Sequence, residues 1–133
     1  MINFYTTIEQ SKKLLELGLS PESADMVYFY WENYKTKEHG IDDIPTVRGE
    51  LPIDKFDVPC WSLAALRKLL PVGIKPDENA TYLFSNHNRI DGTWVYMYAI
   101  DDYVYKQFTG SDINACYDMV VWLLENNYID KGQ

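Results

Sequence analysis

The sequence lacks the features of membrane proteins and of nucleic-acid-binding proteins. It has no run of about 18 apolar residues, the length that a membrane-spanning helix needs, so we expect no membrane contact. It has 20 acidic and only 12 basic side chains, a net charge of −8, which opposes binding to the phosphates of a nucleic acid. The N-terminal residues show no basic region followed by an apolar run, and we therefore expect a cytoplasmic protein.

Motifs for catalysis, cofactors and metals are also missing. Cys60 and Cys116 show no Cys-x-x-Cys spacing, which fits a reducing compartment. His39 and His87 belong to no metal-ligand spacing, and the sequence has no glycine-rich phosphate loop, no Gly-x-Ser-x-Gly elbow and no His-Glu-x-x-His motif. We therefore predict no metal site, no cofactor and no assembled group of catalytic residues.

Aromatic residues, in contrast, are abundant. Twenty of the 133 residues are aromatic, and eleven of these are tyrosines. Over residues 93–100 they alternate with aliphatic residues, so a strand would place Trp94, Tyr96 and Tyr98 on one face. The aliphatic face suits packing beneath helices. The aromatic face then has three alternatives: a second core layer, a seam between copies, or a surface that binds a partner.

The candidate binding residues follow from this pattern. They are Trp94, Tyr96 and Tyr98, together with Tyr103 and Tyr105 from the next strand. Tyrosine and tryptophan offer a large contact area and are enriched where proteins bind each other. The sequence therefore predicts a non-catalytic binding or accessory protein that contacts a protein partner, or a second copy of itself, through an aromatic sheet face.

Capping residues and apolar periodicity predict three helices. The first spans residues 8–17, after a threonine capping box and before Gly18. A short second helix lies between Ser62 and Pro71, and a third runs from Ser111 to about Asn126 with apolar residues at helical spacing.

Strands are predicted at residues 26–31, 82–85, 93–100 and 103–108, the last three as antiparallel neighbours. Residues 34–59 are rich in proline, glycine and acids and are predicted to be a long irregular connection with one short edge strand. So long a connection is unusual, and it is either functional or hides an undetected element. Residues 1–133 are thus expected to form a single α+β domain. Its mostly antiparallel sheet of three to five strands would carry about three helices on one face.

Two other functions stay open. An enzyme of unrecognised type could act on a small molecule if the fold brought Cys60 and His87 together as nucleophile and base, with Asp91 or Asp101 orienting the imidazole. Against this, Cys60 adjoins Trp61, an apolar setting in which a cysteine is usually inert. Alternatively, the acidic surface could mimic a nucleic acid and inhibit a basic protein. That function requires acids clustered along one face.

Three parts of the sequence, taken in order, resemble a known group of proteins. They are residues 9–19 (EQSKKLLELGL) with 23–26 (SADM), residues 59–63 (PCWSL) with 69–71 (LLP), and residues 122–129 (WLLENNYI). Together they are similar to small uncharacterised proteins encoded by gut bacteria and by their phages or mobile elements. These parts are helix caps and apolar stripes, so the resemblance implies a shared fold and supplies no catalytic residue. A mobile-element setting favours a binding, accessory or inhibitory role.

Overall fold

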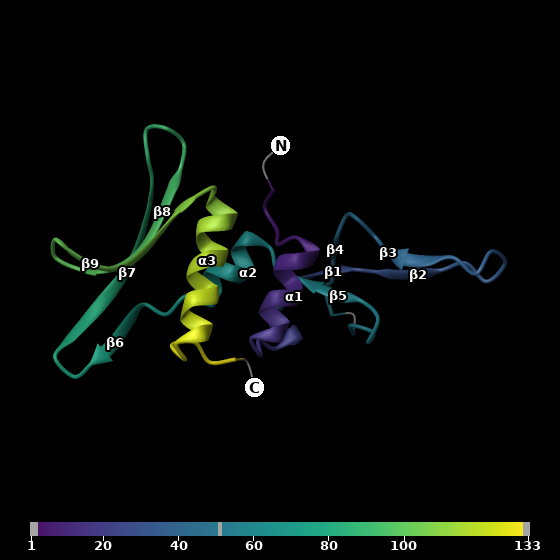
Figure 1. Cartoon of the computed structure of the whole chain (residues 1–133), viewed down its shortest axis with the longest axis horizontal. Coiled ribbons are helices and arrows are strands. Elements are labelled where there is room, and N and C mark those ends of the chain that lie inside the picture. The colour runs from purple at the N-terminus through teal and green to yellow at the C-terminus, as the bar shows by residue number, and fades with distance from the viewer. Residues whose placement is uncertain (1–2, 51, 132–133) are drawn as a thin grey trace.

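Three helices lie in the middle of the molecule between two unequal sets of strands (Figure 1). The computed structural model describes residues 3–50 and 52–131. The helices are α1 (Ile8–Glu16), α2 (Leu63–Lys68) and α3 (Asp112–Glu125), and a 3₁₀ turn, η1 (Pro21–Ser23), follows α1. With its antiparallel sheets the chain forms a small α+β domain, which confirms the predicted fold class.

The larger set of strands is a four-stranded antiparallel sheet. It is built from β6 (Gly73–Asp77), β7 (Ala80–Asn88), β8 (Trp94–Ile100) and β9 (Tyr103–Gly110), in the spatial order β6-β7-β8-β9. The last three were predicted as neighbours. β6 was not predicted, because its lysine, proline and aspartate are residues that strands disfavour.

The helices begin where the capping residues indicate. The Thr7 side chain accepts from Gln10 N, and the Gln10 side chain accepts from Thr7 N, which completes a capping box on α1. Ser62 and Ser111 cap α2 and α3 in the same way, each accepting from the backbone N–H three residues later.

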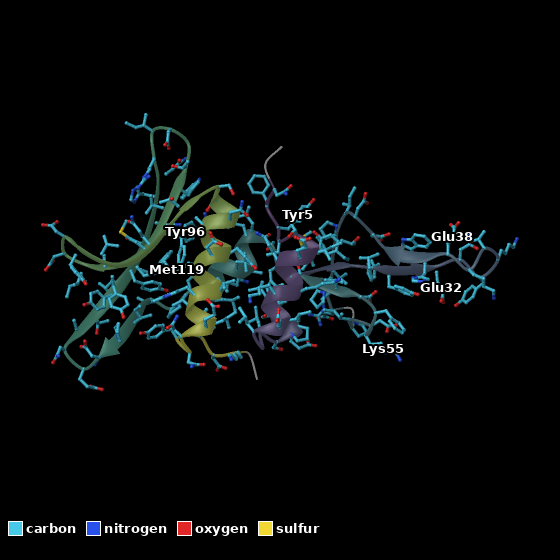
Figure 2. The ribbon with its side chains drawn as sticks, viewed as in Figure 1. Tyr5, Glu32, Glu38, Lys55, Tyr96 and Met119 are labelled. Carbon is cyan, nitrogen blue, oxygen red and sulfur yellow. The ribbon has the colours of Figure 1, made fainter. Side chains whose placement is uncertain are left out.

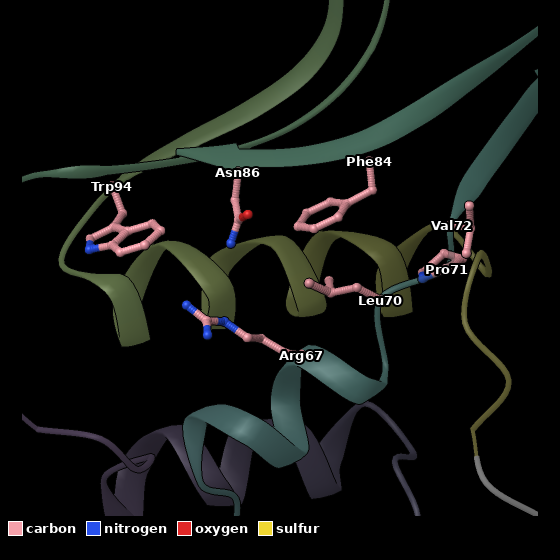
Figure 3. Close-up of a pocket in the computed structure, with 7 residues that line it drawn as sticks. All are labelled: Arg67, Leu70, Pro71, Val72, Phe84, Asn86 and Trp94. Atoms are coloured by element: carbon pink, nitrogen blue, oxygen red, sulfur yellow. The ribbon is translucent and has the colours of Figure 1, made fainter. Parts of the chain in front are cut away.

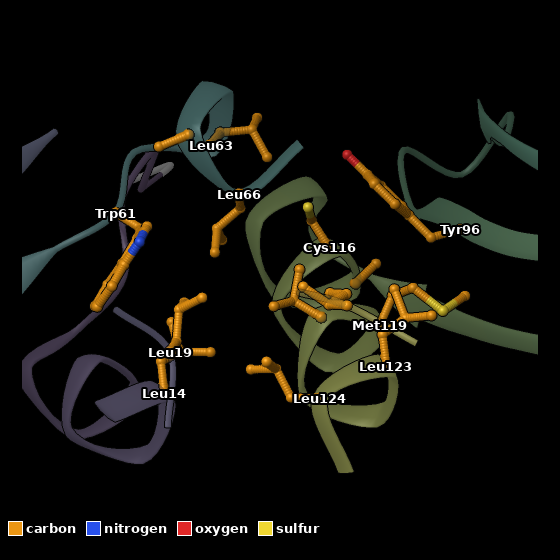
Figure 4. Close-up of a cluster of buried hydrophobic side chains, with 14 of the residues drawn as sticks. Leu14, Leu19, Trp61, Leu63, Leu66, Tyr96, Cys116, Met119, Leu123 and Leu124 are labelled. Carbon is orange, nitrogen blue, oxygen red and sulfur yellow. The ribbon is translucent and has the colours of Figure 1, made fainter. Parts of the chain in front are cut away.

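The main core lies between the four-stranded sheet and the three helices (Figure 4). Trp61 is fully buried there, and its indole N–H donates to Ser23 Oγ at 2.9 Å. The other large side chains that are fully buried in this core include Leu14, Leu66, Tyr96, Tyr98, Met119 and Leu123.

The expectation that the aliphatic face of residues 93–100 would pack beneath helices was wrong. Tyr96 and Tyr98, on the opposite face, have no exposed surface and belong to the core that α3 fills. Small side chains on α3, Ala115 and Cys116, are fully buried in the same cluster and leave room for the rings. The Tyr98 hydroxyl donates to Pro71 O at 2.8 Å. A tyrosine can be buried without loss when its hydroxyl finds a partner in this way.

Three short strands of the smaller set lie in the segment that was predicted to be irregular with one edge strand, and most residues of that segment lie outside strands. β1 (Met26–Tyr28) pairs with β4 (Thr46–Val47) and with β5 (Val58–Cys60), while β2 (Tyr30–Glu32) pairs with β3 (His39–Ile41). The strand predicted over residues 26–31 is therefore two short strands, separated at Phe29. Elements of two or three residues are too short for an alternating pattern to be recognised.

Candidate functional site

A cleft of about 460 Å³ opens where the four-stranded sheet meets α2 (Figure 3). We call the sheet face toward α3 the inner face; it contributes one wall of the cleft, and the other wall comes from α2 and from the chain that leads into β6. Most lining side chains are apolar or aromatic and two are polar, the composition typical of ligand sites. The lining residues are Phe84, Asn86 and Trp94 from the sheet, and Arg67, Leu70, Pro71 and Val72 from the other wall.

Arg67 is held in this cleft by three neighbours. Its Nε donates to the Tyr96 hydroxyl at 3.0 Å, and Nη2 lies 2.7 Å from Asp112 Oδ2. Its guanidinium carbon lies 5.6 Å from the centre of the Trp94 ring, a cation–π distance. The Tyr96 hydroxyl in turn donates to Asp112 Oδ1. The guanidinium group is therefore fixed in position before any ligand arrives.

The electrostatics of this group keep one side of Arg67 available. Burial, reinforced by the hydrogen bond to Asp112, raises the pKa of Tyr96, so its hydroxyl stays protonated at neutral pH. The Arg67 side chain is 41% exposed, and in the described part of the chain Nη1 has no hydrogen-bond partner. Nη1 can therefore donate to a carbonyl or carboxylate oxygen of a ligand.

The cleft lies beside a half of β7 that has no partner strand on its outer side. β6 pairs with β7 as far as Leu83, and its last bond runs from Phe84 N to Val72 O at 2.9 Å. Beyond this point, no strand among residues 3–50 and 52–131 pairs with residues 85–88 on that side. The other side of β7 is paired with β8 along its whole second half.

Two residues in this half of β7 direct backbone groups outward. In an antiparallel ladder, successive residues form hydrogen bonds to opposite sides. Phe84 N–H points toward β6, whereas Arg89 N–H points across the hairpin to Thr93 O at 2.7 Å. The N–H and C=O groups of Asn86 and Asn88 therefore point away from β8, toward the open side.

The structure places the five predicted binding residues in three different settings. Trp94 lines the cleft, while Tyr96 and Tyr98 are buried in the core. Tyr103 and Tyr105, 60% and 38% exposed, lie with other rings away from the cleft. Tyr105 packs 4.8 Å from Tyr82 and 6.2 Å from Trp122, and Tyr103 lies 6.0 Å from Tyr82, measured between ring centres.

Sequence reasoning missed Arg67, Phe84 and Asn86. The alternation of Tyr82, Phe84 and Asn86 with small or aliphatic residues carried a signal for the two on β7. Nothing in the sequence links Arg67 to Trp94, because the contact depends on how α2 docks against the sheet.

A second group of exposed aromatic residues lies on the β2–β3 hairpin, which we call the arm. It projects from the body of the molecule, with Glu32 and Glu38 near its outer part (Figure 2). Residues 31–39 are all exposed, including Trp31 at 44% and Tyr34 at 81%, and none belongs to either core cluster. The arm thus presents Trp31 and Tyr34 to the solvent.

The structure does not bring Cys60 and His87 together. Cys60 is fully buried in β5, and its Sγ donates to Thr6 O at 3.4 Å. Burial raises its pKa to about 11, so the reactive thiolate is scarce at neutral pH. His87 is exposed on β7, on the other side of the helices (Figure 1). The thiol–imidazole pair that an enzyme of this kind requires is therefore not assembled.

The remaining titratable residues form no metal site within the described residues, where no group of three or more His, Cys, Asp or Glu side chains could hold an ion. None of the described helices combines the length and the apolar character needed to cross a membrane. No family model, no curated protein and no solved structure matches the chain.

Proposed function

We propose that this protein is a non-catalytic binding protein that holds an extended polypeptide at the cleft between β7 and α2. The observation that carries the proposal is the position of the cleft beside the open half of β7. An extended polypeptide has the two parts that fit there: a backbone that can continue the sheet, and side chains that can enter an apolar pocket.

The walls of the cleft support this kind of ligand. Trp94 and Phe84 provide aromatic surface, and Leu70 and Val72 provide an apolar end for a side chain. Arg67 offers Nη1 to an oxygen of the ligand, and little conformational entropy is lost on binding because Tyr96 and Asp112 already hold the guanidinium group.

The cleft also favours binding over turnover. Its titratable side chain, Arg67, is engaged with Tyr96 and Asp112 in one closed network of hydrogen bonds. Neither Cys60 nor His87 lines it. A nucleophile with an adjacent base, the arrangement that covalent catalysis needs, does not occur among its lining residues.

The proposal is tested by selecting peptides from a phage-displayed library of random sequences and measuring their affinity for two variants. Val72→Asp places a charge at the apolar end of the cleft, and Val47→Asp makes the same change on β4. Both valines are highly exposed, at 84% and 71%, so both variants should fold.

We expect the selected peptides to bind Val47→Asp as they bind the wild type, and to bind Val72→Asp at least about tenfold more weakly, because the bound peptide would cover the new carboxylate and remove it from water. Failure to select any peptide, or equal affinity for both variants, would contradict the proposal.

A further inference from the structure

We infer that the polypeptide bound at this cleft is a second copy of the same chain, paired through the open half of β7. Two copies would align these half strands antiparallel and join their four-stranded sheets into one sheet. This inference rests on the proposed function of the cleft and adds the identity of the partner.

The open half of β7 is the edge of this sheet that is least protected against pairing. Natural edges are usually blocked by charges, prolines or bulges. The outer edge of β6 carries Lys75, Pro76 and Asp77. β9 carries Lys106, and its pairing with β8 is interrupted by a bulge. Residues 85–88 are Ser, Asn, His and Asn, with no acidic residue, no lysine or arginine, no proline and no break in their register with β8.

The free backbone groups select one two-fold register. A symmetric pairing centred on His87 places Asn86 of each copy opposite Asn88 of the other. Each of these two pairs exchanges two backbone hydrogen bonds, which satisfies all four outward groups of each copy. A register centred on Asn86 would instead place Asn88 opposite Phe84, whose N–H is already bonded to Val72 O.

The same register supplies an apolar side chain for the cleft. It brings the hairpin tip with Ile90 of each copy to the end of the open edge in the other, next to Val72, which is bonded to Phe84 and forms the apolar end of the cleft with Leu70. Ile90 lies at the tip of the β7–β8 hairpin and is completely exposed. The chain therefore carries both the exposed apolar side chain and the apolar pocket that would cover it.

Charge and size determine how strong this association can be. The net charge of −8 on each copy opposes close approach, but the two copies would meet along a seam that carries no acidic residue. Four residues on each side form a small interface, well below the roughly 1,200 Å² that stable complexes bury. The dimer should therefore be reversible, and added salt should strengthen it by screening the negative charges.

Sedimentation equilibrium over a range of protein and salt concentrations tests this inference with a matched pair of variants. Asn88→Pro removes the outward N–H and spares the bonds to β8, which the odd-numbered residues make. Asn88→Ala keeps the N–H. We expect the wild type and Asn88→Ala to dimerise with rising concentration, and Asn88→Pro to dimerise at least about tenfold more weakly. The reason is that the Asn88→Pro dimer lacks two backbone hydrogen bonds between uncharged groups.

Ile90→Ser serves as a second variant if proline disturbs the fold, with Ile44→Ser as its control at another highly exposed position, since Ile44 is 69% exposed. Ile90→Ser should weaken the dimer and Ile44→Ser should not. A wild type that stays monomeric at high salt, or variants that dimerise like their controls, would overturn the inference. A monomeric wild type that still binds peptides in a manner sensitive to Val72→Asp would overturn the dimer alone and leave the proposed function standing.

Discussion

The two halves of the molecule use aromatic residues in opposite ways. On the side of the four-stranded sheet, Tyr96 and Tyr98 have no exposed surface, whereas on the arm Trp31 and Tyr34 are 44% and 81% exposed. Tyr96 and Tyr98 alternate with aliphatic residues, whereas Trp31 and Tyr34 stand among charged residues such as Glu32 and Lys35. An aromatic side chain is therefore not buried by its type alone, and the difference lies in the neighbouring residues and in what covers each strand.

The covering helix explains the contrast. β7 and β8 are nine and seven residues long, so each presents a continuous inner face that α3 can cover. β2 and β3 have three residues each, and the described residues 31–39 pack against neither core cluster. An isolated two-stranded hairpin is only marginally stable in water. The arm should therefore open more readily than the sheet.

Removing one aromatic ring from each half of the molecule should give the largest difference in the free energy of unfolding. Tyr98→Ala leaves a cavity in the core and should lower the free energy of unfolding by about 4 kcal/mol. Tyr34→Ala should change it by less than about 0.5 kcal/mol, because the side chain is exposed. Urea denaturation of the two variants and the wild type measures both values. Equal losses would mean that the inner face is not the core of the protein.

Alkaline pH should weaken the protein through its buried thiols. Burial raises the pKa of Cys60 to about 11 and of Cys116 to about 12 from an ordinary value of 9.0. As the pH rises, the unfolded chain therefore loses these thiol protons before the folded chain does. The contribution of the buried thiols to the free energy of unfolding is complete below pH 9 and is lost as the pH rises above that value. Between pH 8 and pH 10 each thiol should account for a loss of about 1 kcal/mol.

Urea denaturation at the two pH values measures this loss, and Cys60→Ala provides the control. Between the two pH values, the free energy of unfolding of Cys60→Ala should fall less than that of the wild type, by about the amount that one thiol contributes. An identical decrease in wild type and variant would show that Cys60 does not ionise more readily in the unfolded chain.

The hydroxyl that links the core to the cleft should contribute less to stability than the Tyr98 ring does. Tyr96→Phe keeps the ring but removes the donor to Asp112 and the acceptor for Arg67 Nε. The expected cost is about 1.5 to 3 kcal/mol, the usual range for a hydrogen bond to a charged group. Tyr103→Phe, at a 60% exposed position, should cost almost nothing. Denaturation curves that coincide for the two variants would contradict this role of Tyr96.

The sequence was informative where patterns are long and less so where they are short. α3 and β8 were predictable because their apolar or aromatic periodicity extends over seven or more residues, while β9 and, over residues 82–85 only, β7 were recognised as neighbours of β8. β3, β4 and β5 were not, because strands of two or three residues are too short to show alternation, and β3 and β5 also include Gly40 and Pro59. Their pairing depends on tertiary contacts with β1 and β2.

The candidate site was only partly predictable for a similar reason. Alternation places Trp94, Tyr96 and Tyr98 on one face, but it does not reveal which face a helix will cover. The cleft requires α2 to bring Arg67 beside Trp94, residues that are 27 positions apart in the sequence. Such a long-range contact leaves no periodic signal in a single chain.

Amide hydrogen exchange at Asn86 and Asn88, followed by NMR at low and high protein concentration, tests the pairing of β7 most directly. In the dilute protein both amides should exchange rapidly, because they point away from β8, while the amide of His87 should be protected by the ladder. In the concentrated protein the amides of Asn86 and Asn88 should become protected as the second copy binds. If they stay unprotected at every concentration, β7 does not pair with a second copy.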